Sequence, residues 1–129
     1  MNIEVSISDK INAKEVPSSL VLSWESGVTL TLEMLILERV RLEVEAQHKM
    51  AVTGLPDFHP LVAWQREASQ GDEMEMRIAE AQKVALEGFS ENAYFLIVDG
   101  KQLVDLDAEI KLSPNTQVQF LRLMPLKGG

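Results

Sequence analysis

The sequence predicts an α+β domain, with a mixed sheet of about five strands, a helix crossing one face and an added helical insertion. Three patterns support this class. Apolar and polar residues alternate within the first 25 positions, apolar residues then recur at helical spacing from position 31, and short apolar runs return after position 93. With 129 residues, 46% hydrophobic and 25% charged, the chain suits a single domain over residues 1–129.

The first two strands come from alternating segments. Residues 3–8 and 19–25 each place apolar side chains on one face and polar side chains on the other, as in half-buried strands. The residues between them are polar and reach Pro17, so we expect a loop without strand structure. Together these segments predict an antiparallel hairpin with a long connection.

A helix is predicted over residues 31–47, with Thr31 as its N-cap. The buried stripe is expected to consist of Leu32, Leu35, Ile36, Val40 and Val44. The exposed side is expected to hold Glu33, Glu38, Arg39, Glu43 and Glu45. The sequence therefore predicts one apolar face turned to the sheet.

The insertion, about residues 47–93, is predicted to be irregular at first and helical later. Residues 48–73 contain two prolines and two glycines and show no sustained period. Residues 75–89 return to helical spacing, and Gly88 is expected to mark the end of that helix.

The last third is predicted to form three strands. Residues 93–98 are a continuous apolar run, typical of a strand covered on both faces or nearly so. Asp99 and Gly100 are a strong type I′ turn signal, so residues 101–106 should pair back onto that run. A turn follows, and residues 116–124 are predicted to form the final strand.

Composition excludes several classes of function. A net charge of -8 disfavours nucleic-acid binding, and no apolar run approaches the ~20 residues of a membrane span. The absence of cysteine and of a signal-peptide core fits a cytoplasmic location. His48 and His59 are the only histidines and lack a third partner at metal-ligand spacing, so we expect no metal site. No catalytic constellation stands out, and we expect no enzyme activity.

Two short motifs resemble ubiquitin. Residues 100–103 are Gly-Lys-Gln-Leu, and a final strand then leads into residues 125–129, Pro-Leu-Lys-Gly-Gly. Leu126 and Lys127 match a leucine and a basic residue that precede the two glycines of ubiquitin, whereas Pro125 stands where ubiquitin has arginine. The resemblance covers residues 1–46 by pattern and 94–129 by motif, and the insertion departs from it.

The resemblance implies a ubiquitin-like β-grasp fold and a chain that is the substrate of an activating enzyme. That enzyme uses ATP to turn the terminal carboxylate into an acyl-adenylate, and a sulfur nucleophile then displaces AMP. The conjugation and adenylation site would be Gly128 and Gly129. The contacts to the activating enzyme would be Pro125, Leu126 and Lys127. Glycine eases passage through a narrow channel, and proline ends sheet pairing.

The partners implied are an activating enzyme, a conjugating enzyme, an isopeptidase and target proteins modified on lysine. Bacterial ubiquitin-like conjugation operons, some implicated in anti-phage defence, are the setting that the resemblance suggests. We expect no cofactor on the chain itself, because ATP is used by the activating enzyme.

Two alternatives stay open. The proline and aliphatic residue before Gly-Gly also resemble the sulfur carriers, such as the small subunit of molybdopterin synthase, whose final strand has a Val-x-Phe like that at 118–120. Such a carrier would form a C-terminal thiocarboxylate for cofactor or thionucleoside synthesis. The chain could instead be a non-covalent β-grasp adaptor.

The final strand also holds a possible partner patch. Val118 and Phe120 are expected to face the helix, whereas Leu121 and Leu123 occupy positions similar to the recognition face of ubiquitin. The patch interpretation competes equally with one in which the insertion covers these two leucines. Arg122 falls at an inward position, so a bulge or offset is a possible complication.

Overall fold

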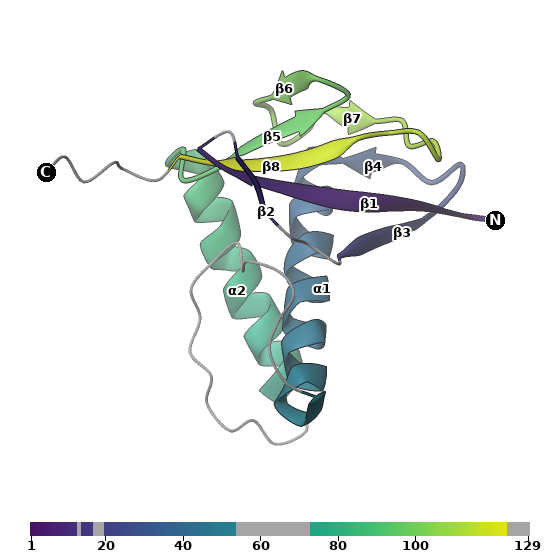
Figure 1. Cartoon of the computed structure of the whole chain (residues 1–129). Helices are drawn as coiled ribbons and strands as arrows, with labels where there is room; N and C mark the ends of the chain where they lie inside the picture. Colours follow the sequence, from purple (N-terminus) through teal and green to yellow (C-terminus); the bar gives the residue numbers. More distant parts are fainter. Residues whose placement is uncertain (13, 17–19, 54–72, 124–129) are drawn as a thin grey trace, which may run out of the picture.

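The computed structural model describes residues 1–12, 14–16, 20–53 and 73–123. It is an α+β structure in which two helices lie on the same side of a mixed sheet (Figure 1). The predicted class is therefore confirmed. The sheet is larger than predicted, because it has six strands and a separate two-stranded sheet lies beside it.

The order of the main sheet is β2-β1-β8-β5-β6, and β3 also pairs with β1. Its strands are β1 (Asn2–Ile11), β2 (Lys14–Val16), β3 (Val21–Glu25), β5 (Phe95–Val98), β6 (Lys101–Leu103) and β8 (Val118–Arg122). β1 and β8 are parallel, and the other pairs are antiparallel. The small antiparallel sheet consists of β4 (Leu30–Thr31) and β7 (Glu109–Ile110).

Strand β2 corrects the prediction of a connection without strand structure. β3 pairs only with residues 2–6 of β1, which leaves the second half of β1 without a partner on that edge. Residues 14–16 supply this partner, in register from Asp9–Val16 to Ile11–Lys14. Polar residues can form such a strand because the ladder uses main-chain groups, which every residue carries.

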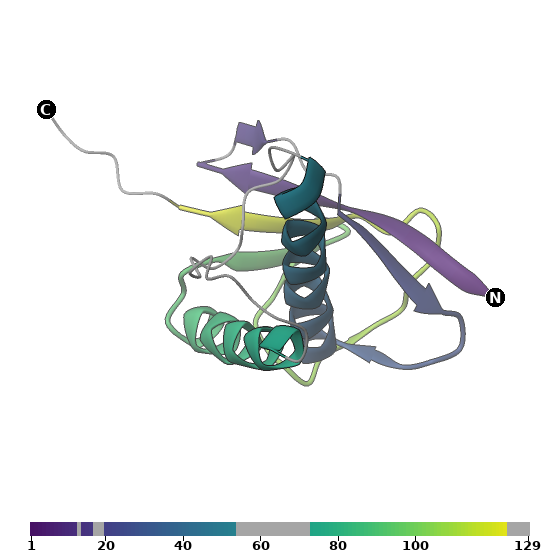
Figure 2. The ribbon, with the colours of Figure 1, turned by 90° about the horizontal axis from the view of Figure 1, so that it is seen from below.

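Helix α1 spans Leu32–Thr53, and helix α2 spans Glu73–Ser90. The N-cap prediction for α1 is confirmed, since Thr31 Oγ1 accepts a hydrogen bond from the amide of Met34 at 3.2 Å. α1 continues beyond the predicted end because residues 48–53 contain neither glycine nor proline. α2 packs beside α1, and Gln82 Nε2 donates to the carbonyl of Leu37 at 3.0 Å (Figure 2).

Gly88 does not end α2 as predicted. Asn92 has a φ of 62° and ends the helix through a Schellman motif, in which the amide of Ala93 donates to the carbonyl of Gly88 at 2.8 Å and that of Asn92 to Phe89 at 3.2 Å. After this turn the chain reverses direction and packs against Gly88. Its closest neighbours beyond the turn are Ala93 and Tyr94.

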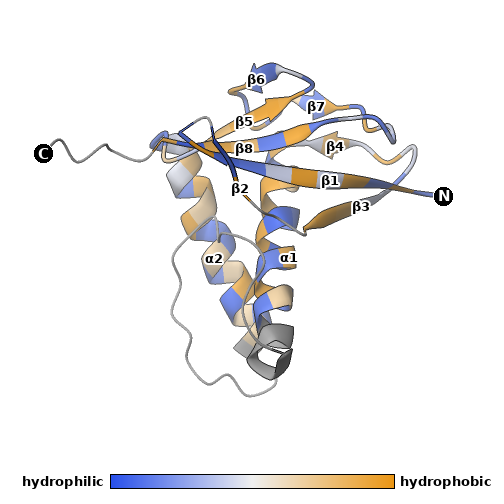
Figure 3. Cartoon of the chain, in the orientation of Figure 1, coloured by the Kyte–Doolittle hydropathy of each residue, from blue (hydrophilic) through white to orange (hydrophobic). Residues whose placement is uncertain are grey.

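One apolar core fills the space between the sheet and the helices. The inner face of the sheet contributes alternating residues, which leaves Leu96 and Phe120 fully buried. Val118 is also buried, so the predicted orientation of β8 is confirmed. On β1 the buried inward series of Val5 and Ile7 continues with Asp9, and Figure 3 shows hydrophilic colour close to the C-terminal end of this strand.

The predicted β5–β6 hairpin is confirmed. Asp99 and Gly100 have φ values of 51° and 80°, as a type I′ turn requires. The carboxylate of Asp99 also accepts a hydrogen bond from the amide of Gln117 at 2.8 Å, which ties the turn to the loop before β8. β5 is covered on one face rather than two, since only Leu96 among its residues is fully buried.

Neither of the described helices combines the length and the apolar character needed to cross a membrane.

Two glycine substitutions should have opposite effects on stability. Gly88→Ala should raise the free energy of unfolding by up to about 1 kcal/mol, because alanine favours the helix. The added Cβ would meet Ala93 and Tyr94 at an ordinary 3.5 Å. Gly100→Ala should lower it by about 1–2 kcal/mol, because its φ of 80° strains a residue with a side chain. Urea denaturation of both variants checks this, and effects of the same sign would contradict the two assigned backbone roles.

Candidate functional site

Strand β8 ends next to the segment predicted to carry the reactive tail. β8 pairs in parallel with β1 up to Ile11–Arg122, and the amide of Asn12 donates to the carbonyl of Arg122 at 2.9 Å. The C-terminal ends of β1 and β8 therefore lie at the same end of the sheet (Figure 1). The main chain of Arg122, the last residue of β8, is therefore held by a hydrogen bond to the residue that follows β1.

The predicted reactive residues lie outside the described part of the chain. They are Gly128 and Gly129 at the conjugation site and Pro125, Leu126 and Lys127 at the enzyme contacts. Their roles stay predictions. The described fold supplies their point of attachment, which is Leu123 after the end of β8.

The predicted patch residues Leu121 and Leu123 lie where β8 ends. Leu121 is half-buried and pairs with Phe95 of β5, and Leu123 is 60% exposed. Because Leu96 and Phe120 point into the core, alternation places Phe95, Ile97 and Leu121 on the outer face. We call Phe95, Ile97, Leu121 and Leu123 the outer stripe. The β5 members of the stripe were not predicted, because the continuous apolar run at residues 93–98 is typical of a strand covered on both faces.

Four charged side chains lie on the inner side of the same strand end, and we call them the charge cluster: Asp9, Arg39, Glu43 and Arg122. The Arg39 guanidinium donates to both carboxylate oxygens of Asp9, from Nη2 to Oδ2 at 2.9 Å, and its Nε donates to Glu43 Oε1 at 2.8 Å. Arg122 Nη2 lies 3.9 Å from Asp9 Oδ2. Asp9, Arg39 and Glu43 are at most 1% exposed.

The charges in this cluster compensate one another. Burial lowers the pKa of Arg39, but the hydrogen bond to Asp9 and the negative charges of Glu43 and Asp9 outweigh it, so the net pKa is raised. For Arg122 burial dominates, and its pKa is lowered. Arg39 Cζ also lies 4.6 Å from the ring centroid of Phe120, a cation–π contact. A permanently charged Arg39 thus joins β1, α1 and β8.

The prediction that Arg39 and Glu43 lie on the exposed side of the helix is wrong. Counted from Leu32, these residues follow at i+7 and i+11, which belong to the same face as the buried leucines. The inward alternation of β1 and β8 likewise includes Asp9 and Arg122, so β8 needs no bulge to accommodate Arg122. Spacing would have found the cluster. Residue polarity concealed it, because charged residues are rarely buried unless they are paired.

The described residues contain no cluster of side chains suited to a metal ion. Within residues 1–12, 14–16, 20–53 and 73–123, no three His, Asp or Glu side chains gather in a way that could hold a metal ion. Glu43 and Asp9 instead both contact the Arg39 guanidinium. The arrangement is suited to holding a strand end in place.

Comparisons with known proteins give no match. No protein-family model matches the chain, and neither a curated protein nor a solved structure is significantly similar to it.

Breaking the charge cluster should cost more stability than replacing it. Arg39→Met should lower the free energy of unfolding by about 3–5 kcal/mol, because Asp9 and Glu43 would stay buried without their guanidinium. The quadruple variant Asp9→Val, Arg39→Met, Glu43→Leu, Arg122→Met should recover most of that loss, because no charge of the cluster is then left without compensation. Chemical denaturation measures both.

Arg41→Met is the matched control, since Arg41 lies on the same helix and pairs with Glu38 and Glu45 at 45% side-chain exposure. It should change the free energy of unfolding by at most about 1 kcal/mol. An Arg39→Met variant no less stable than this control would show that the buried network does not hold the fold.

Proposed function

We propose that the chain is a ubiquitin-like β-grasp modifier, activated at the carboxylate of Gly129 and conjugated to lysines of target proteins. The observation that carries the proposal is the path of β8: the last strand lies at the centre of the sheet, parallel to β1, and leads into a Leu-Lys-Gly-Gly motif. The sheet order, with a helix crossing after the first hairpin, is compatible with a β-grasp.

The proposed chemistry needs no catalytic group on this chain. A carboxylate oxygen of Gly129 attacks the α-phosphorus of ATP, and pyrophosphate leaves. A cysteine thiolate of the activating enzyme then attacks the acyl carbon, a thioester forms and AMP leaves. Finally a lysine amine of the target attacks the thioester, which gives an isopeptide bond and releases the thiolate after loss of a proton.

The charge cluster supports this function because it holds the end of β8, the strand that precedes the tail in the sequence. Asp9 lies between Arg39 of the helix and Arg122, the last residue of β8. The hydrogen bond from Asn12 holds the main chain at the same residue. A tail presented to an enzyme channel benefits from a fixed origin, because less conformational freedom is lost on binding.

The sulfur-carrier alternative rests on a specific motif. Pro125 and Leu126 before the two glycines, with Val118 and Phe120 in the final strand, resemble the carriers more than ubiquitin. In that case sulfide sulfur, delivered by a persulfide or an equivalent donor, replaces AMP on the acyl carbon and leaves a thiocarboxylate. The Gly-Lys-Gln-Leu motif, Lys127 and the helical insertion favour the modifier.

Deleting Gly129 should abolish activation. With ATP and its cognate activating enzyme, the chain should form a thioester adduct that thiol reductants cleave, and the variant lacking Gly129 should form none. Non-reducing gel electrophoresis detects the adduct. An adduct that persists without Gly129 would exclude both chemical functions. No adduct with either chain would favour the adaptor.

Intact mass then separates the two chemical functions. A thiocarboxylate adds about 16 Da, because sulfur replaces oxygen. A conjugated modifier instead leaves Gly-Gly on target lysines after trypsin cleaves behind Lys127. Adding one alanine after Gly129 is the control, and it should block both products unless a protease removes it.

Leu123→Asp should slow transfer to a conjugating enzyme by about tenfold while leaving the free energy of unfolding within about 0.5 kcal/mol, because Leu123 is 60% exposed. Leu121→Asp should slow transfer as well but should also lower stability, because Leu121 is half-buried beside Phe95. Single-turnover kinetics and denaturation of each variant test this. If Leu123→Asp leaves the rate of transfer unchanged, the outer stripe does not take part in binding the conjugating enzyme.

A further inference from the structure

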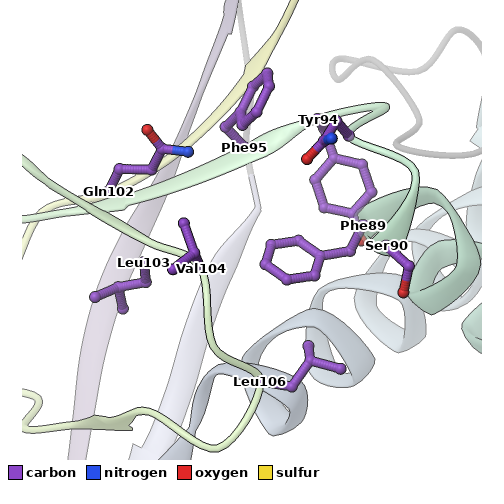
Figure 4. A pocket seen from close by; sticks show the side chains of 9 residues that line it. Phe89, Ser90, Tyr94, Phe95, Gln102, Leu103, Val104 and Leu106 are labelled. Carbon is purple, nitrogen blue, oxygen red and sulfur yellow. The ribbon is translucent and has the colours of Figure 1, made fainter.

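A hollow of about 240 Å3 lies between the C-terminal end of α2, the start of β5 and the segment after β6 (Figure 4). Its apolar and aromatic lining consists of Phe89, Tyr94, Phe95, Leu103, Val104 and Leu106. Ser90, Asn92 and Gln102 add polar groups to it. Val104 is 74% exposed, one of the most exposed large apolar side chains in the described residues. The hollow is thus open to solvent, with a lining of six apolar or aromatic residues and three polar ones.

The α2 wall of the hollow is fixed in shape. The Schellman motif at Asn92 ends the helix, and the hydroxyl of Tyr94 donates to the carbonyl of Ala85 at 2.6 Å. Burial raises the pKa of that hydroxyl, so it remains a donor at neutral pH. The ring of Phe89 packs against Tyr94 with centroids 5.9 Å apart.

The opposite wall is fixed as well. Asp105 Oδ1 accepts from the amide of Asp107 at 3.0 Å, and the amide of Ala108 donates to the carbonyl of Asp105 at 2.9 Å. The carbonyls of Leu106 and Ala108 accept hydrogen bonds from the first turn of α1. A site preformed on both sides loses little conformational entropy when something binds to it.

Acidic residues adjoin the hollow on both sides. The two segments that supply most of its lining, residues 87–92 and 104–107, contain four acidic residues and no basic residue. Glu91 stands between Ser90 and Asn92, and Asp105 stands between Val104 and Leu106, and both acids are exposed. Lys101 begins β6 at the opposite end from Leu103, on the order of 7 Å along the strand. The charge therefore favours a cationic partner.

We propose that this hollow docks a segment of a partner protein in which one or two large apolar side chains are flanked by lysine or arginine. Its volume is below the ~300–1,000 Å3 of small-molecule pockets, but it accommodates the side chains of such an anchor. The apolar lining supplies most of the affinity, and the acids around it select basic flanks. α2, the part of the chain that departs from ubiquitin, thereby gains a recognition role.

This docking site is separate from the tail chemistry. It stands whether or not Gly129 is activated, because none of its lining belongs to β8. Phe95 borders both the hollow and the outer stripe, so variants that test the hollow leave Phe95 unchanged.

The test is an NMR titration of the full 15N-labelled chain with an octapeptide that carries a phenylalanine–leucine pair between two pairs of lysines. Amide shifts should concentrate at Ser90, Asn92 and residues 104–107. Val104→Ser should weaken binding about tenfold, or about 1.4 kcal/mol, because the serine side chain buries less apolar surface against the peptide. Glu91→Gln with Asp105→Asn should weaken binding several-fold and reduce its dependence on salt, while the introduced amide oxygen still accepts the hydrogen bond from Asp107.

Val28→Ser is the matched control, because Val28 is 50% exposed and lines a second hollow beside Trp24. It should leave the affinity unchanged. The same peptide with glutamates in place of lysines should bind at least tenfold more weakly. Equal binding of the acidic peptide, equal loss in Val28→Ser and Val104→Ser, or shifts confined to Leu121 and Leu123 would each overturn the proposal. The NMR spectrum of each variant also reports whether it is folded.

Discussion

The ion pair between Arg39 and Asp9 connects the crossing helix to the first strand inside the core. Because neither side chain reaches water, the pair constrains much of its surroundings. Asp9 has to stay on the inner face of β1, and the register of β1 against β8 then places Phe120 beneath the guanidinium. Glu43, one turn further along α1, accepts a hydrogen bond from Arg39 Nε and so orients the guanidinium. α1 cannot rotate about its axis without breaking the buried hydrogen bonds from Arg39 to Asp9 of β1. The helix, the two parallel strands and the end of the sheet are thus fixed by one network.

The surfaces proposed for function lie around this fixed end. β8 ends beside the charge cluster, the outer stripe lies on the opposite face of β8 and β5, and the hollow lies against α2, where β5 begins and β6 ends. A modifier of the proposed kind needs an accessible reactive terminus on a rigid body and separate surfaces for its partners. Leu123, Phe95 and Val104 lie at the same end of the sheet, which is compatible with one protein at the end of β8 and another at the hollow.

Much of the fold could be predicted because local chemistry determines it. Alternation specified β1, helical spacing specified α1 and α2, and Asp99 and Gly100 specified their turn. Strand β2 was not predicted, because main-chain pairing with β1 holds it and its side chains show no strand pattern. The charge cluster escaped because polarity was used as a proxy for exposure, although the spacing of Arg39 had already placed it on the inner face.

The sequence by itself determined both helices and most of the strands, with the short strands β2, β4 and β7 as exceptions. It also determined the Leu-Lys-Gly-Gly motif that follows the last strand. Both depend on interactions between residues close in the chain, such as capping, turn geometry and the periodic placement of apolar groups. Only the tertiary structure decided that Asp9 meets Arg39, thirty positions away, and that Phe95 pairs with Leu121. It also decided that Val104 lies across a hollow from Phe89. These contacts join distant segments, and their formation depends on how the sheet order folds the chain back on itself.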